Sequence, residues 1–112
     1  MLNKEMLILQ SNVLPSEAIL TIVPTIMPPL SATHLHILYT DTANVIENGP
    51  LYKDSPVEYS IETNRVIAIN VWDTRIQYKI TPLNNIENFR ETTAELYFSL
   101  KGNVTLEITV HE

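Results

Sequence analysis

Apolar and polar residues alternate with a period of two along most of this chain, and long stretches with the 3.6-residue period of an amphipathic helix are missing from it. Such alternation is typical of β-strands that turn one face to a core and the other to water. The pattern predicts strands at residues 4–10, 17–23, 33–40, 57–62, 66–72, 76–81, 94–100 and 104–110, with a shorter piece at 43–47.

The connections between these segments contain turn residues and no crossover helices. Strands spaced in this way are typical of antiparallel sandwiches and barrels. We therefore expect an all-β protein: one antiparallel β-sandwich domain over residues 1–112, of about seven to nine strands, with Ig-like or jelly-roll connections.

The phase of the apolar residues also predicts strand pairing, because a slip of one residue moves every side chain to the opposite face of the sheet. Three hairpins keep the apolar residues of neighbouring strands together. Their turns are residues 63–65 with Ile61 opposite Ile67, residues 72–75 with Val71 opposite Ile76, and residues 101–103 with Leu100 opposite Val104. In the first turn, Asn64 or Arg65 is expected to adopt a left-handed conformation.

The same phase predicts a core. The side chains expected to be buried together are those of Ile67, Ile69, Val71, Tyr78, Phe98 and Leu106.

A single helical signal lies in the sequence NNIENFRETT. Asn84 can cap a helix, Glu87 follows three residues later, and Ile86 and Phe89 would share a helical face. We expect at most one short helical turn, near residues 85–91.

Composition excludes several classes of function. The chain has 13 acidic and 7 basic residues and a net charge of −6, and its basic residues are scattered, so we expect binding neither to nucleic acid nor to an anionic membrane. It has no cysteine, which excludes disulfides and thiolate chemistry. It has two glycines, too few for a dinucleotide or phosphate-binding loop, and its turns must rely on Asn, Asp and Pro.

The start of the chain, MLNKEMLILQSN, lacks the layout of a signal peptide, and no apolar stretch is long enough to span a bilayer. We therefore expect a cytoplasmic or virion-associated protein.

His34 and His36 are candidate metal ligands, because residues i and i+2 of a strand point to the same side. A cupin-like metal site would add a carboxylate and a third histidine. The nearest carboxylate, Asp41, has the opposite strand phase, and His111 is at the far end of the chain. We interpret the pair as solvated strand residues, and we expect no metal and no cofactor.

Glu58 and Glu62 share the outer face of one strand with Ser60. Paired carboxylates act as acid and base only where a pocket separates their pKa values, and these alternate with apolar residues as on a half-exposed strand. No serine lies in a sequence that resembles a strained nucleophile turn. We expect no enzymatic activity.

An apolar outer face is the most informative feature of residues 66–72. Val66, Ala68 and Trp72 lie there out of phase with the core, and Arg75 follows at the same turn. Tyr97 has the matching phase in its own strand, and Trp, Tyr and Arg dominate the energetics of protein interfaces. These five residues form a candidate interface, unless another part of the same chain covers them.

The sequence therefore favours a non-enzymatic structural or protein-interaction module, with a protein partner or a second copy of itself. A repeated subunit of a larger assembly, such as a virion or a phage head or tail accessory protein, fits this description. The alternatives are a small-ligand or carbohydrate-binding sandwich that stacks its ligand on Trp72, Tyr97 or Tyr39, an acidic inhibitor of another macromolecule, and a metal-dependent β-barrel enzyme.

Overall fold

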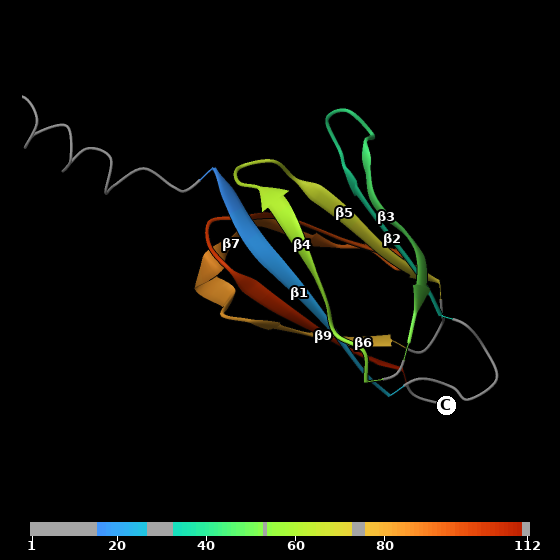
Figure 1. The fold of residues 1–112 in the computed structure, drawn as a ribbon. Coiled ribbons are helices and arrows are strands. Elements are labelled where there is room, and N and C mark those ends of the chain that lie inside the picture. Colours follow the sequence, from blue (N-terminus) through green and yellow to red (C-terminus); the bar gives the residue numbers. More distant parts are fainter. Residues whose placement is uncertain (1–15, 27–32, 53, 73–75, 111–112) are drawn as a thin grey trace, which may run out of the picture.

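The computed structural model describes residues 16–26, 33–52, 54–72 and 76–110 (Figure 1). The strand predicted at 4–10, most of the turn predicted at 72–75, and His111 lie outside these ranges. None of the described residues forms a helix long and apolar enough to cross a membrane.

The described residues form nine strands and one short 3₁₀ turn. The strands are β1 (Glu17–Ile26), β2 (Thr33–Tyr39), β3 (Val45–Leu51), β4 (Val57–Glu62), β5 (Ile67–Trp72), β6 (Ile76–Thr81), β7 (Ile86–Glu91), β8 (Glu95–Leu100) and β9 (Val104–Val110). The 3₁₀ turn, η1 (Leu83–Asn85), connects β6 to β7.

Two sheets pack face to face, which confirms the predicted all-β sandwich. One has four strands in the order β4-β1-β9-β6, and the other has five in the order β3-β2-β5-β8-β7. Every neighbouring pair is antiparallel except β1 and β9, which run parallel.

The three predicted hairpins are wrong. β4 pairs with β1 rather than β5, β6 pairs with β9 rather than β5, and β8 and β9 belong to different sheets. Among the described strands, only β2–β3 and β7–β8 are consecutive strands that pair in one sheet. Apolar phase shows which residues face the core, but it does not distinguish a neighbour in the same sheet from a strand facing it across the sandwich.

The predicted core is confirmed at five of its six positions. Ile67, Ile69, Val71, Phe98 and Leu106 are buried, and Tyr78 is half-buried against them. The rest of the core comes from the inward residues of β1, β2, β4, β8 and β9, together with Leu51 of β3, so both sheets contribute to it.

The predicted short helical turn corresponds to η1, which lies slightly earlier in the chain than residues 85–91 and shares only Asn85 with them. Residues 86–91 are extended and form β7 at the edge of the five-stranded sheet. Ile86 and Phe89, which the sequence places on one helical face, therefore belong to a strand.

Left-handed backbone falls largely on Asn and Asp, as the scarcity of glycine predicts. Asn64 (φ 66°), Asn88 (φ 58°) and Asp54 (φ 57°) adopt it, together with Ala43 (φ 61°). Asn64 lies in the predicted turn between β4 and β5, and its side chain tolerates this conformation at low energetic cost.

The hydroxyl group of Thr33 is buried at the start of β2. Thr33 is 1% exposed, and its Oγ1 has no hydrogen-bond partner among the described residues. Burying such a group unpaired is destabilising, so we expect Thr33→Val to raise the free energy of unfolding by about 1 kcal/mol, measured by urea denaturation.

Thr40→Val is the matched control, because Thr40 Oγ1 donates a hydrogen bond of 3.0 Å to the carbonyl of Val66. We expect no stabilisation from it. Equal effects at the two positions would contradict the prediction for Thr33.

Candidate functional site

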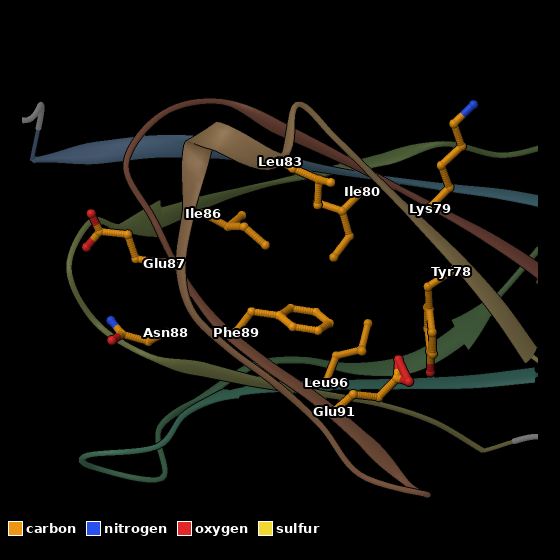
Figure 2. A pocket seen from close by; sticks show the side chains of 10 residues that line it. All are labelled: Tyr78, Lys79, Ile80, Leu83, Ile86, Glu87, Asn88, Phe89, Glu91 and Leu96. Carbon is orange, nitrogen blue, oxygen red and sulfur yellow. The ribbon is translucent and has the colours of Figure 1, made fainter.

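An open groove lies between the outermost strands of the two sheets, as the described residues form them. β6 is the last strand of the four-stranded sheet and β7 of the five-stranded sheet, and the two edges face each other on one side of the sandwich. The groove measures about 680 Å³. Its lining residues are Tyr78, Lys79, Ile80, Leu83, Ile86, Glu87, Asn88, Phe89, Glu91 and Leu96 (Figure 2).

A bulge in β7 shapes one wall of this groove. Glu87 pairs with Ser99 and Arg90 with Tyr97, so Asn88 and Phe89 together stand opposite one residue of β8. Asn88 takes the left-handed conformation. The extra residue shifts the alternation of the strand, which is the usual effect of a bulge.

The side chains of Phe89 and Arg90 take their positions from this shift. Phe89 points into the groove among apolar side chains (Figure 2). Arg90 instead stacks on the ring of Tyr97, with its guanidinium carbon 4.2 Å from the ring centre. The amide of Asn88 fixes the bulge by donating a 3.0 Å hydrogen bond to Ser99 Oγ.

The groove exposes large apolar side chains to solvent. Phe89 is 51% exposed and Leu83, presented by η1, is 68% exposed. Exposed apolar surface gathered in one concave place is characteristic of contact sites in soluble proteins.

Charged groups lie at the rim. Lys79 and Glu87 point away from the centre of the groove, and Glu87 forms an ion pair with Lys101 at 3.4 Å (Figure 2). Burial raises the pKa of the Tyr78 hydroxyl, and the nearby carboxylate of Glu91 adds to this effect. The groove thus combines an apolar floor with a polar rim, a combination suited to an extended peptide with apolar side chains.

On the opposite side of the sandwich, a hydrogen bond joins the two edge strands. There the edge strands are β3 and β4, and Tyr59 of β4 donates a 2.7 Å hydrogen bond to Glu47 of β3. Burial and this hydrogen bond to a carboxylate raise the pKa of Tyr59. Pro50 also lies in β3, where it removes one backbone donor from that edge.

His34 and His36 lie side by side on the outer face of β2, as predicted, while Leu35, Ile37 and Tyr39 are buried. His34 Nε2 is hydrogen-bonded to Asn48 Oδ1. Within the described part of the chain, no three His, Asp or Glu side chains come together as a metal site would require. The absence of a metal stays a prediction, since His111 is outside that part.

Glu58, Ser60 and Glu62 are exposed on the outer face of β4, in agreement with the solvated-face interpretation. Ser60 Oγ donates a 2.8 Å hydrogen bond to Glu17, and Glu62 forms an ion pair with Arg65. The two glutamates therefore have separate surroundings on an open surface.

The candidate interface on β5 is only partly described. Ala68 is 4% exposed, and the neighbouring strands bring Leu38 and Tyr97 opposite it, so it offers almost no surface. Val66 is half-buried. Arg75 and the side chain of Trp72 lie outside the described residues.

Tyr39 and Tyr97 are unsuited to stacking an open ligand. Tyr39 is buried under the guanidinium of Arg65, and Arg90 covers the ring of Tyr97. Of the three proposed stacking residues, Trp72 alone stays a candidate.

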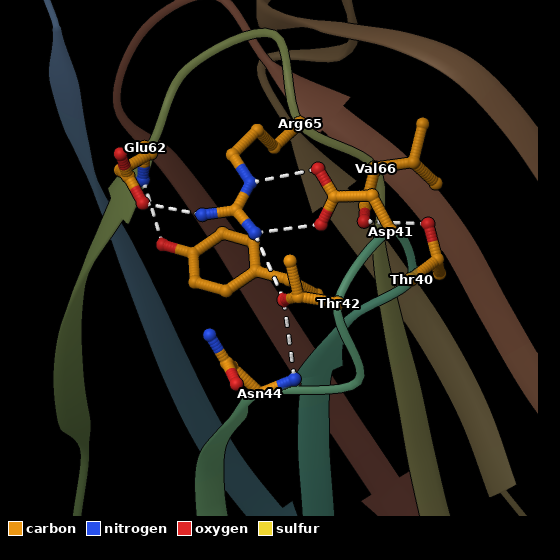
Figure 3. Close-up of polar contacts among 8 residues, drawn as sticks. Thr40, Asp41, Thr42, Asn44, Glu62, Arg65 and Val66 are labelled. Carbon is orange, nitrogen blue, oxygen red and sulfur yellow. Dashed lines mark hydrogen bonds and ion pairs between the residues drawn. The ribbon is translucent and has the colours of Figure 1, made fainter.

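Arg65 organises the corner where the β2–β3 turn meets the β4–β5 turn (Figure 3). It donates to both carboxylate oxygens of Asp41, at 2.6 and 3.0 Å, and it also contacts Glu62 and Thr42. Its guanidinium carbon lies 3.8 Å from the centre of the Tyr39 ring. This bidentate arrangement is the strongest geometry for an arginine–carboxylate pair.

Hydrogen bonds from Arg65 lower the pKa of Asp41. A lowered pKa in the folded state stabilises the protein above the ordinary aspartate value of about 3.9, and this stabilisation is lost as the pH falls through the folded-state value. We therefore expect Asp41→Asn to lower the thermal midpoint at pH 7, and the difference from the unmodified protein to shrink as the pH falls below about 4 and to vanish only below the lowered pKa of Asp41.

Glu58→Gln removes the same charge from an exposed position of β4 and is the control for Asp41→Asn. Its thermal midpoint should stay near that of the unmodified protein at every pH. A midpoint difference for Asp41→Asn that does not shrink at all as the pH falls below about 4 would show that the ion pair is not its cause.

The sequence reasoning missed the groove. The helical interpretation of residues 85–91 places Phe89 on a helical face, and it gives Leu83 no role. A usable signal was present, because Leu83, Ile86 and Phe89 concentrate large apolar residues in a short segment rich in Asn and Glu.

Among solved structures, a bacterial adhesin from Mobiluncus mulieris, crystallised in two space groups, shares the fold of this chain. It is described as containing intramolecular disulfide, isopeptide and ester bond cross-links. The TM-scores are 0.60 and 0.61 at 11% sequence identity. The alignments cover 85% and 88% of this chain, which spans less than half of the adhesin chains (42% and 43%). No protein-family model and no curated protein matches the sequence.

Proposed function

We propose that this chain is a non-enzymatic structural module, a repeated subunit of a larger assembly, which binds an extended apolar segment of a protein in the groove between β6 and β7. The observation that carries the proposal is the contrast between the two sides of the sandwich. A hydrogen bond from Tyr59 to Glu47 joins the two edges on one side, whereas Phe89 and Leu83 remain exposed on the other, beside a groove.

Edge strands with free backbone groups and an apolar surface beside them are sites of strand addition. The backbone groups provide affinity, and pockets for alternate side chains provide specificity. The adhesin with the same fold supports a binding role. A virion or phage particle is the setting that the sequence favours for such a subunit.

Light scattering over a range of protein concentrations tests the proposal. We expect a solution mass above the 12.8 kDa of one chain, rising with concentration. A single-chain mass at every concentration would exclude self-assembly.

We also propose that the outer face of β5 forms a second contact, centred on Trp72 and Arg75. Replacing a buried interface tryptophan commonly weakens binding by about thirty-fold or more. We expect Trp72→Ala to remain folded by circular dichroism and to shift the assembly to lower mass. An unchanged mass would remove Trp72 from the interface.

A further inference from the structure

We propose that the strand accepted by β6 comes from a second copy of this chain, through residues 4–10 of its sequence, KEMLILQ. This inference rests on the proposed function and names the partner of the same groove. The result is a head-to-tail contact in which each copy offers one strand and one groove.

β6 is better suited than β7 to accept a strand. Among the described residues β6 pairs with β9 alone, and its register runs without a break from Ile76 to Thr81. The bulge at Asn88 interrupts the ladder of β7. The six residues of this unbroken strand match the seven residues of the segment in length.

The segment has the side chains that this place requires. A strand beside β6 would have the inward residues Tyr78 and Ile80 on one side and the exposed ring of Phe89 across the groove. Alternate side chains of that strand would face the groove, so its inward positions require apolar residues. Residues 6–9 of the chain, Met-Leu-Ile-Leu, supply two apolar inward positions in either phase, and polar residues flank them.

The strand register disfavours insertion of residues 4–10 into the groove of their own copy. Thr21 of β1 and Thr81 of β6 both pair with Thr105, so Ser16 lies five residues beyond the level at which β6 ends. Five residues of strand correspond to about 16 Å, and three strand spacings from β1 to an added strand correspond to about 14 Å. The straight path from Ser16 to the end of the added strand is then about 21 Å.

Six residue steps connect position 10 to Ser16, and a fully stretched chain covers about 20–22 Å in six steps. The straight path is also obstructed, because Asn85 of η1 contacts the loop before β9 by donating a 2.9 Å hydrogen bond to the carbonyl of Asn103. The residues between position 10 and Ser16 would have to be fully extended for the segment to reach the groove of its own copy. A segment from a second copy has no such restriction on its length.

The chain has no cysteine, so engineered cysteines give a direct test. Lys79 lies on β6 at the rim of the groove, and its replacement removes no apolar contact from the floor. We propose to mix Lys79→Cys with Leu7→Cys, and separately with Ile8→Cys, under mild oxidation, each variant being the full chain. Directly opposed residues of paired strands have Cα atoms about 4.5–5.5 Å apart, within the range of a disulfide.

We expect a covalent dimer on a non-reducing gel from at least one of the mixtures, formed about tenfold or more faster than with the control. The control replaces Lys79→Cys by Val45→Cys, which is exposed on the opposite edge, in β3. Because neighbouring residues of a strand face opposite ways, either Leu7 or Ile8 should react faster, and the faster one shows which side faces outward.

Three results would overturn the inference. Dimer formation at the rate of the Val45→Cys control would show no specific contact. A double variant, Lys79→Cys with Leu7→Cys or Ile8→Cys, that yields only an internally cross-linked single chain would place the segment in its own groove. Assembly of the unmodified protein without any cross-link would retain the proposed function and reject residues 4–10 as the partner.

Discussion

Replacing Leu106 by alanine should lower the free energy of unfolding by about 2–5 kcal/mol, the range observed when a buried leucine is truncated. Leu106 is fully buried (0% exposed) in β9, where it pairs with Ile22 on one side and Ile80 on the other. A strand paired on both sides has little freedom to close the resulting cavity. Urea denaturation measures the change as a lower midpoint at an unchanged slope.

Val45→Ala serves as the control for Leu106→Ala. Val45 is 54% exposed at the edge of the five-stranded sheet, and substitutions at such places usually change stability by less than about 0.5 kcal/mol. If the two variants were equally stable, Leu106 would not be in the core and the placement of β9 would be wrong.

Replacing Phe89 by serine should weaken assembly by about thirty-fold or more, because large aromatic side chains at the centre of a contact contribute about 2 kcal/mol or more. Phe89 is half-exposed in the groove, so the isolated chain loses little packing and should remain folded. Light scattering at several concentrations gives the shift in the association midpoint, and circular dichroism confirms folding.

Tyr52→Ser is the matched control for Phe89→Ser. Tyr52 is another exposed aromatic residue, 64% exposed, and it does not line the groove. Assembly should be unchanged in this variant. Equal weakening by both substitutions would indicate contact through general surface hydrophobicity and would reject the groove as the binding site.

The sequence predicted the faces of the strands well and their partners poorly. Leu35 and Phe98 are buried where alternation placed them, since the period of two follows directly from backbone geometry. Pairing is different, because Ile61 and Ile67 have matching phase and yet belong to opposite sheets. Both arrangements bury the same side chains, so alternation alone does not choose between them.

A single inserted residue in β7 is the reason that the sequence pattern did not predict the groove. Ile86 and Phe89 are three positions apart, a spacing typical of one face of a helix, and in β7 the bulge at Asn88 brings about the same spacing on one face of a strand. Sequence reasoning has no means of recognising this without knowledge of the partner strand, since a bulge is defined by what stands opposite it.

The contacts of Arg65 are a third feature that the alternation of residues along the sequence does not predict. Its contacts with Asp41 and Tyr39 join turns that are more than twenty residues apart in the sequence. Alternation describes strands only, and the meeting of two turns depends on the order of strands in both sheets.

The unequal sides of the sandwich also set the connectivity of a polymer that grows through the groove. In its described part, the domain has one edge open beside an apolar groove, while the hydrogen bond between Tyr59 and Glu47 ties the opposite pair of edges together. A unit with one acceptor and one donor has a valence of two, so growth through this contact is linear and unbranched, with a distinct head and tail. A copy with a damaged groove and an intact donor segment would act as a chain stopper, and its molar fraction would set the mean length of the polymer.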